Sequence, residues 1–135
     1  MSAAAGSAIY SRLSGDATLT ALGVTGIYYG IAPAGAAAPY VTIQQVDGED
    51  ARVFGARAHS RLTFHVKGWD EGPSHLRAKQ IAERCDALLD EYALSVGGTA
   101  VMSCRRGAIL PDLTEVTNGI QYRQAGGLYD IEVNS

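Results

Sequence analysis

The sequence predicts an α+β domain, in which helices pack on an antiparallel β-sheet. One observation is an apolar stripe between Ser74 and Tyr92, where apolar residues recur at spacings of three and four, as on one face of a helix. The other is the alternation of apolar and polar residues over His59–Trp69, which is typical of a strand with one buried face. The elements are expected in the order helix, three strands, helix, three strands. The length of 135 residues favours a single domain, 1–135.

The N-terminal part of the chain predicts a short helix and a second helical turn. Apolar residues form one stripe over Ala3–Leu13, Gly15 is placed to end this helix, and Asp16 is placed to cap the next turn. A short strand is expected over Ile27–Ile31. The Ala- and Pro-rich segment Ala32–Pro39 is interpreted as a linker within the domain.

A long connection, Asp47–Ala58, joins the predicted strands Tyr40–Val46 and His59–Trp69. Ordinary hairpin loops have roughly two to five residues, and longer loops are commonly functional or disordered. The apolar pair Val53–Phe54 lies between charged residues, which resembles an interface hot spot. The candidate partner-interface residues are Glu49, Asp50, Arg52, Val53, Phe54 and Arg57. An alternative stays open, in which the two strands continue as a ribbon and Phe54 folds back on the core.

The helix predicted over Ser74–Tyr92 is the most regular element of the chain. Pro73 suits its first turn, and its apolar stripe is expected to pack against Leu62, Phe64 and Val66 of the preceding strand. The stripe consists of Ala78, Ile81, Ala82, Cys85, Leu88, Leu89 and Tyr92.

The C-terminal part predicts three more strands. Leu94–Val96 and Thr99–Arg105 flank Gly97–Gly98, a pair that suits a tight hairpin turn. In the last strand, Ile120–Val133, the apolar residues change from even to odd positions, so a β-bulge is expected at Gly126–Gly127. The segment Pro111–Asn118 is interpreted as an extended loop.

The sequence contains no recognisable pattern for chemistry. Cys85, Cys104 and the three histidines lack the short spacing of a zinc site, and no G-x-S-x-G motif is present. We therefore expect no catalytic residue, no cofactor and no metal. Cys85 and Cys104 are expected to be buried free thiols.

Charge and hydropathy argue against nucleic-acid binding, a membrane span and a secretory signal. The formal charge of −3 argues against general nucleic-acid binding. Arg105, Arg106 and Arg123 are interpreted as solvated surface, with a small phosphate-attracting patch as the alternative. No apolar run approaches the roughly 20 residues of a membrane span. The N-terminus also lacks the positive region of a secretory signal.

Taken in order, Ala17–Leu22, Gly26–Gly30, Pro39–Ile43, the alternating strand and the Ala/Ile-rich helix resemble the tail completion family of long-tailed bacteriophages. This family is also called tail terminator or head–tail joining. The resemblance covers roughly Leu13–Val133. It implies a structural virion protein rather than an enzyme, with no catalytic residues to carry over.

The resemblance also implies the partners and the place of the protein. It implies a homo-oligomeric ring, a hexamer, that contacts the major tail tube protein on one face and the head–tail connector or stopper protein on the other. Genome DNA would pass through the hole, and no membrane is involved. The location implied is the tail–neck junction of the virion, after synthesis in the host cytoplasm.

Two segments depart from the family pattern, namely the Ala-rich linker Ala34–Ala38 and the extended loop Pro111–Asn118. Two alternative functions stay open beside the tail completion reading. One is another ring component of the neck or connector. The other is a small-ligand-binding or hydrolase α+β domain, which a monomer with a deep polar pocket would favour.

Overall fold

The computed structural model describes residues 2–33, 35–53, 56–71, 74–91, 94–96, 100–117 and 119–134. The elements lie in the chain order α1, α2, β1, β2, β3, α3, β4, β5, β6 and β7. Their bounds are α1 Ser2–Leu13, α2 Ala17–Ala21, β1 Ile27–Tyr29, β2 Tyr40–Val53, β3 Ala56–Asp70, α3 Leu76–Leu89, β4 Leu94–Val96, β5 Ala100–Ile109, β6 Leu113–Thr117 and β7 Ile120–Asn134. The predicted α+β class is confirmed.

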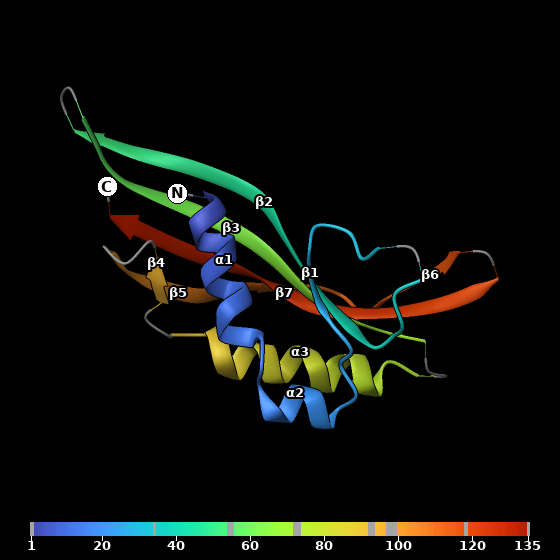
Figure 1. Ribbon diagram of the computed structural model, residues 1–135. Helices are drawn as coiled ribbons and strands as arrows, with labels where there is room; N and C mark the ends of the chain where they lie inside the picture. The colour runs from blue at the N-terminus through green and yellow to red at the C-terminus, as the bar shows by residue number, and fades with distance from the viewer. Residues whose placement is uncertain are drawn as a thin grey trace.

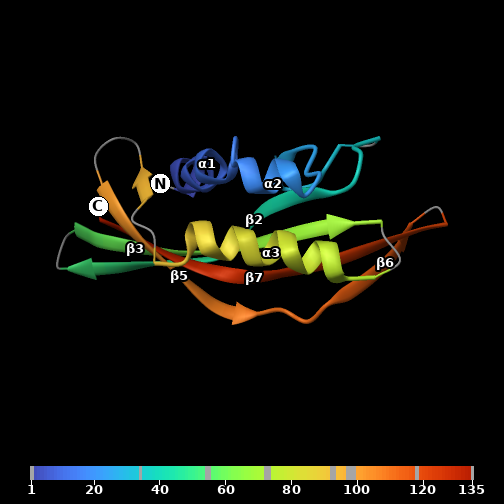
Figure 2. The same ribbon diagram turned by 90° about the horizontal axis from the view of Figure 1, so that it is seen from below.

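One seven-stranded sheet forms the body of the molecule, with the strand order β1-β2-β3-β7-β5-β4, and β6 pairs with β7 beside this path. All described pairs are antiparallel except β1 with β2, which is parallel. The three helices of the described chain lie on one side of the sheet, so its other face carries no helix (Figures 1 and 2). We call these the helix face and the bare face.

The core lies between the described helices and the helix face of the sheet, and α1 contributes Ala5, Ile9 and Leu13 to it. Leu62, Phe64 and Val66 belong to the buried cluster, as predicted. The buried residues of α3 are Ala78, Ile81, Cys85, Leu88 and Leu89. The helix is shorter than predicted, because it begins at Leu76 and ends at Leu89, and the predicted end at Tyr92 lies outside the described residues.

Gly68 of β3 sets how closely α3 approaches the sheet. A Cβ atom at this position would lie 2.8 Å from the Ile81 Cγ2 atom and 3.0 Å from the Ala78 carbonyl oxygen. These distances are shorter than ordinary van der Waals contact, so the helix packs directly over the glycine.

The N-terminal elements follow the prediction. Gly15 has a φ of +79°, which glycine adopts without a steric penalty, and α1 ends before it. The Asp16 carboxylate accepts a hydrogen bond from the Leu19 amide at 3.0 Å, so Asp16 caps α2. Arg84 of α3 donates two hydrogen bonds to the same carboxylate, at 3.0 and 2.8 Å, which ties α2 to α3.

Two predictions for the C-terminal half are wrong. The segment 111–118 is not one loop, because Leu113–Thr117 forms β6 and pairs with β7. The last strand has no bulge at Gly126–Gly127, because β7 pairs with β3 without interruption, and the extra residue lies in β5 between Arg106 and Ile109. The change of apolar phase in β7 has another cause.

The apolar residues of β7 change position because the strand packs with one face in its first part and with the other face in its last part. Tyr122 packs on Trp69 with ring centroids 6.4 Å apart, and these two rings lie on the bare face. Tyr129 and Ile131, by contrast, are buried on the helix face. The apolar positions therefore switch from even to odd while the strand itself stays regular.

Candidate interaction surfaces

The connection between β2 and β3 is a protruding ribbon rather than a loop, so the loop prediction for Asp47–Ala58 is wrong. The two strands stay paired out to Val53 and Ala56, with register shifts at Gln45/Asp47 and Ala51/Arg52. Figure 1 shows this ribbon reaching beyond the other strands at one end of the sheet. The structure therefore confirms one part of the alternative hypothesis, namely that the two strands continue as a ribbon.

The predicted partner-interface residues all fall on or next to this ribbon. Glu49 is exposed, and its Oε1 lies 3.6 Å from the Arg61 Nη2 atom, a surface pair that contributes little stability. Arg52 and Arg57 occupy directly paired backbone positions. The side chains of Asp50, Arg52, Val53 and Arg57 lie outside the described residues, as does Phe54 as a whole.

In the part of the chain that the structure describes, the sheet edge at β2 is open over a long stretch, whereas the edge at β5 is partly covered. β1 covers the outer side of β2 only at Val41–Ile43, so the stretch from Gln44 onward has no outer strand. β4 covers the outer side of β5 only at Ala100–Met102, but beyond it the Glu91 amide donates a hydrogen bond to the Cys104 carbonyl at 2.7 Å, and the Arg106 amide donates one to Asp90 Oδ1 at 2.8 Å. A strand edge with unpaired backbone groups is a template for pairing with another chain.

A second protrusion lies at the end of the sheet opposite the ribbon, where β6 and β7 form a hairpin (Figure 1). Its large apolar side chains are exposed, with exposed fractions of 50% for Leu113, 63% for Val116 and 41% for Ile120. We call these three residues the hairpin patch, although only Leu113 and Ile120 share a face and Val116 lies on the other face of the hairpin. This hairpin was not predicted, although the β-branched run before Gly119 is a strand-and-turn signal in the sequence.

A cleft of about 610 Å³ lies between α3 and the segment that leads from β5 to β6. Its polar groups pair with one another. Lys79 Nζ lies 3.3 Å from Asp112 Oδ2, and Arg106 Nη1 lies 3.2 Å from Asp86 Oδ2. The Tyr129 hydroxyl donates a hydrogen bond to Asp86 at 2.9 Å, and burial together with this bond raises the pKa of Tyr129. Such mutual pairing is typical of a structural network.

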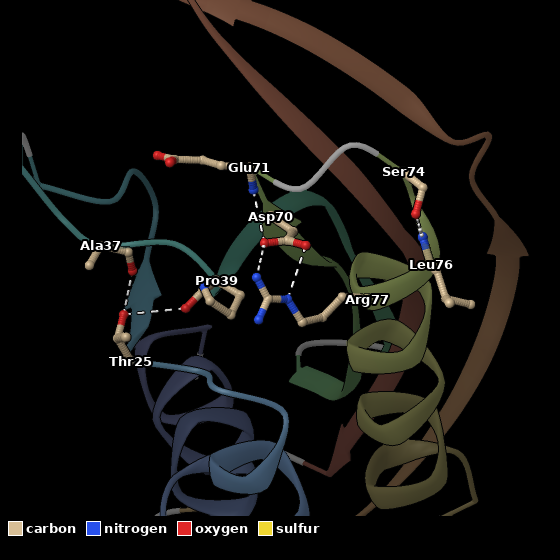
Figure 3. A network of polar contacts seen from close by, with 8 residues as sticks. All are labelled: Thr25, Ala37, Pro39, Asp70, Glu71, Ser74, Leu76 and Arg77. Carbon is tan, nitrogen blue, oxygen red and sulfur yellow. Dashed lines mark hydrogen bonds and ion pairs between the residues drawn. The ribbon is translucent and has the colours of Figure 1, made fainter.

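Polar contacts also fix the segment between β1 and β2 and the entry to α3 (Figure 3). The Thr25 hydroxyl donates hydrogen bonds to the carbonyls of Ala37 and Pro39, the latter at 3.3 Å. At the end of β3, both oxygens of Asp70 accept hydrogen bonds from Arg77. The Ala-rich segment therefore packs as part of the domain.

Burial shifts the pKa values of both cysteines and of His65. Burial raises the pKa of both the Cys85 and the Cys104 thiols to about 12, so neither forms a thiolate at neutral pH. Burial, with a smaller effect of Lys67, lowers the pKa of His65 to about 4. Among the described residues, no group of three or more His, Cys, Asp or Glu side chains is placed to hold a metal ion. No helix in the same residues is long and apolar enough to span a membrane.

Comparisons with known proteins match nearly the whole chain. A family model described as tail completion protein gp17 matches residues 7–110. A chain in the virion of a native gene transfer agent particle superposes with a TM-score of 0.76 and 20% identity, over 96% of this chain and 94% of that chain. A second solved chain gives a TM-score of 0.64 and 18% identity, over 97% of this chain and 95% of that one. At these identities the two structures show a shared fold. Among curated proteins, none matches this chain in sequence.

Proposed function

Because the chain belongs to the tail completion protein gp17 family, whose model covers residues 7–110, we propose that it forms the ring that closes a phage tail and joins it to the head. Members of this family are structural proteins of the tail, so this chain is a structural component of a phage-like virion. Beyond this structural role, we propose that the chain forms a ring, that the ring has six subunits, and that a different partner binds each of its faces.

The observation that carries this proposal is the pair of unlike protrusions at opposite ends of one sheet (Figure 1). The ribbon at one end is rich in charged residues, whereas the hairpin patch at the other end exposes Leu113, Val116 and Ile120. A joining ring must bind two different partners, the major tail tube protein and the connector or stopper protein of the head. Two chemically different ends supply two different docking surfaces.

The ribbon is the arm that we assign to a protein partner. In its sequence, Val53 and Phe54 are the apolar pair, and Arg52 and Arg57 are the basic residues. Like charges at paired strand positions destabilise a hairpin, and an acidic partner would relieve that repulsion. Glu49 and Asp50 would add register through charge pairing with a basic group of the partner.

A purely structural role agrees with the chemistry of the described residues. The polar groups of the cleft pair with one another, and both thiols are buried. The Tyr129 hydroxyl lies beside the Asp86 carboxylate, but burial and this hydrogen bond raise its pKa, so the hydroxyl is not activated as a nucleophile. Genome DNA would meet the protein only in transit through the ring, in keeping with the net charge of −3.

The test is deletion of the gene from the element that encodes it, followed by electron microscopy of the particles. We expect unattached heads together with tails of uncontrolled length, and rescue by the wild-type gene. Reconstruction of rescued particles should place a six-fold ring of this chain at the head-proximal end of the tail. Normal joined particles without the gene would contradict the proposal, and so would density for the chain at another place.

A further inference from the structure

β1 covers the first part of the outer edge of β2. There the Val41 amide donates a hydrogen bond to the Gly26 carbonyl at 3.1 Å, and the Ile43 carbonyl accepts one from the Gly30 amide at 2.6 Å. Successive residues of a strand direct their backbone groups to opposite edges in turn. Val41 and Ile43 therefore present their backbone polar groups to the outer edge of the sheet.

Beyond β1, a bulge changes which residues of β2 point outward. The register shifts between Gln45 and Asp47, whereas β3 pairs with β7 without a shift. Because β3 keeps its alternation, the β2 partners of its even-numbered residues all point outward. These partners are Val41, Ile43 and Gln45 before the bulge, and Gly48 and Asp50 after it.

The outward amide of Gly48 is already bonded within its own strand. It donates a hydrogen bond to the Asp47 Oδ1 atom at 2.8 Å. A second register shift, between Ala51 and Arg52, ends the regular stretch soon afterwards. The stretch between the two bulges therefore has a short outer edge, and the first of its outward amides has an acceptor.

The edge of β5 carries the same kind of contact, supplied by the chain after α3. The Asp90 Oδ1 atom accepts a hydrogen bond from the Arg106 amide at 2.8 Å, and the Glu91 amide donates one to the Cys104 carbonyl at 2.7 Å. Glu91 has a φ of +58°, which is uncommon for a residue other than glycine. A register shift between Arg106 and Ile109 then ends the regular edge, as on β2.

At both edges, a carboxylate therefore holds an amide that an added strand would use. A further strand pairs through the outward N–H and C=O groups of alternate residues. Natural sheets prevent contact of one edge with another by bulges, by charged side chains and by segments that cover the edge. The residues that supply these features here, Asp47 and Asp90, are both exposed.

We propose that Asp47 and Asp90 are edge-blocking residues, which keep free copies of this chain from joining sheet to sheet into open-ended polymers. Their carboxylates act by occupying the amides of Gly48 and Arg106. The proposal concerns the isolated chain and goes beyond the function proposed above. A contact between sheets that does not close would continue into a fibre, so blocking it keeps the chain available for its specific partners.

The test replaces both carboxylates in the isolated chain 1–135. Asp47→Ala combined with Asp90→Ala removes both acceptors. Asp47→Asn combined with Asp90→Asn is the matched control, because the side-chain oxygen of Asn still accepts a hydrogen bond. Circular dichroism compares the fold of each variant with the wild type. Light scattering and thioflavin T fluorescence, which reports sheets that extend across chains, then measure association at equal concentration.

We expect the double Ala variant to form polymers at least about tenfold faster than the wild type, because two edge amides then lack an acceptor. The double Asn variant should behave as the wild type. A folded double Ala variant that associates no faster than the wild type would overturn the proposal. Equal association of the Ala and Asn variants would also overturn it, because charge rather than the hydrogen bond would then protect the edges.

A single variant keeps the test decisive if the double Ala variant does not fold. Asp47→Ala changes one exposed residue of β2 and leaves the chain after α3 unchanged. We expect this variant to associate faster than the wild type and faster than Asp47→Asn. A folded Asp47→Ala variant that matches the wild type in light scattering would show that Asp47 does not block the β2 edge, and the proposal would fail.

Discussion

Arg77 of α3 donates two hydrogen bonds to Asp70, the last residue of β3, from Nε to Oδ2 at 3.0 Å and from Nη2 to Oδ1 at 2.8 Å. The side chain of Asp70 is 3% exposed, whereas that of Arg77 is 47% exposed. The Glu71 amide donates a further hydrogen bond to Asp70 Oδ1 at 2.9 Å. The two members of this ion pair therefore differ in exposure to solvent, because the carboxylate is buried and the guanidinium reaches water.

This inequality predicts an asymmetric response to mutation. Arg77→Met leaves a buried carboxylate without its cation and should lower the free energy of unfolding by about 2–3 kcal/mol, less than for a fully buried pair. Asp70→Asn keeps an acceptor for the Glu71 amide and should lower it by about 1 kcal/mol. Urea unfolding of both variants measures the difference. Equal losses would show that burial of Asp70 does not set the energy of this pair.

Gly68→Ala should destabilise the domain by about 1–3 kcal/mol, the usual effect of overpacking a filled site. The added Cβ would lie 3.0 Å from the Ala78 carbonyl oxygen, a backbone atom that moves only with the helix. The matched control is Gly48→Ala, where the nearest atoms, at 3.1 Å, are the ends of the Gln45 and Leu62 side chains. Thermal unfolding should separate the two variants, and similar losses would mean that α3 has room to move.

His65 should make stability depend on pH. Its pKa falls from 6.5 to about 4, because burial first and Lys67 second disfavour the charged ring. Between these values the unfolded chain binds more protons than the folded one, so stability rises with pH. The contribution is present above about pH 6.5 and is lost as the pH falls toward 4. His65→Gln should flatten the stability curve in this window, and an unchanged slope between the two proteins would contradict the assignment.

Phe54→Ala tests the ribbon as a partner-binding arm. Truncating an apolar anchor at an interface commonly costs more than 1 kcal/mol of binding. The variant should therefore block tail completion while leaving the melting temperature of the isolated subunit nearly unchanged. Tail completion is measured by counting joined particles, and the melting temperature is measured by calorimetry. A subunit that unfolds on this change would place Phe54 in the core, and Leu88→Ala serves as the control for that outcome because Leu88 is 6% exposed.

The parts of the fold that the sequence predicts well are those with one buried face. In α3 and in the Leu62–Val66 part of β3, burial imposes a period that is visible in the residues themselves. The ribbon and β6 lack this signal, since residues such as Gly48, Glu49 and Val116 are exposed irrespective of the face they occupy. Without a core on either side, alternation has no physical cause.

The sequence predicts the candidate interface poorly for the same reason. The prediction for Glu49 to Arg57 depends on a long loop, yet the connection is a paired ribbon. The open edge of β2 from Gln44 onward depends on which strands are neighbours in the sheet. The strand order results from contacts distant in the chain, so no local pattern reports it.

The continuous pairing of β2 with β3, from Tyr40 and Trp69 to Val53 and Ala56, also changes the energetics of capture. A slack loop would lose its conformational freedom only on meeting a partner, at about 1–2 kcal/mol for each residue fixed. In a ribbon, that loss has already occurred during folding of the subunit. Encounter can then proceed as docking between preformed surfaces, with more of the contact energy retained as affinity.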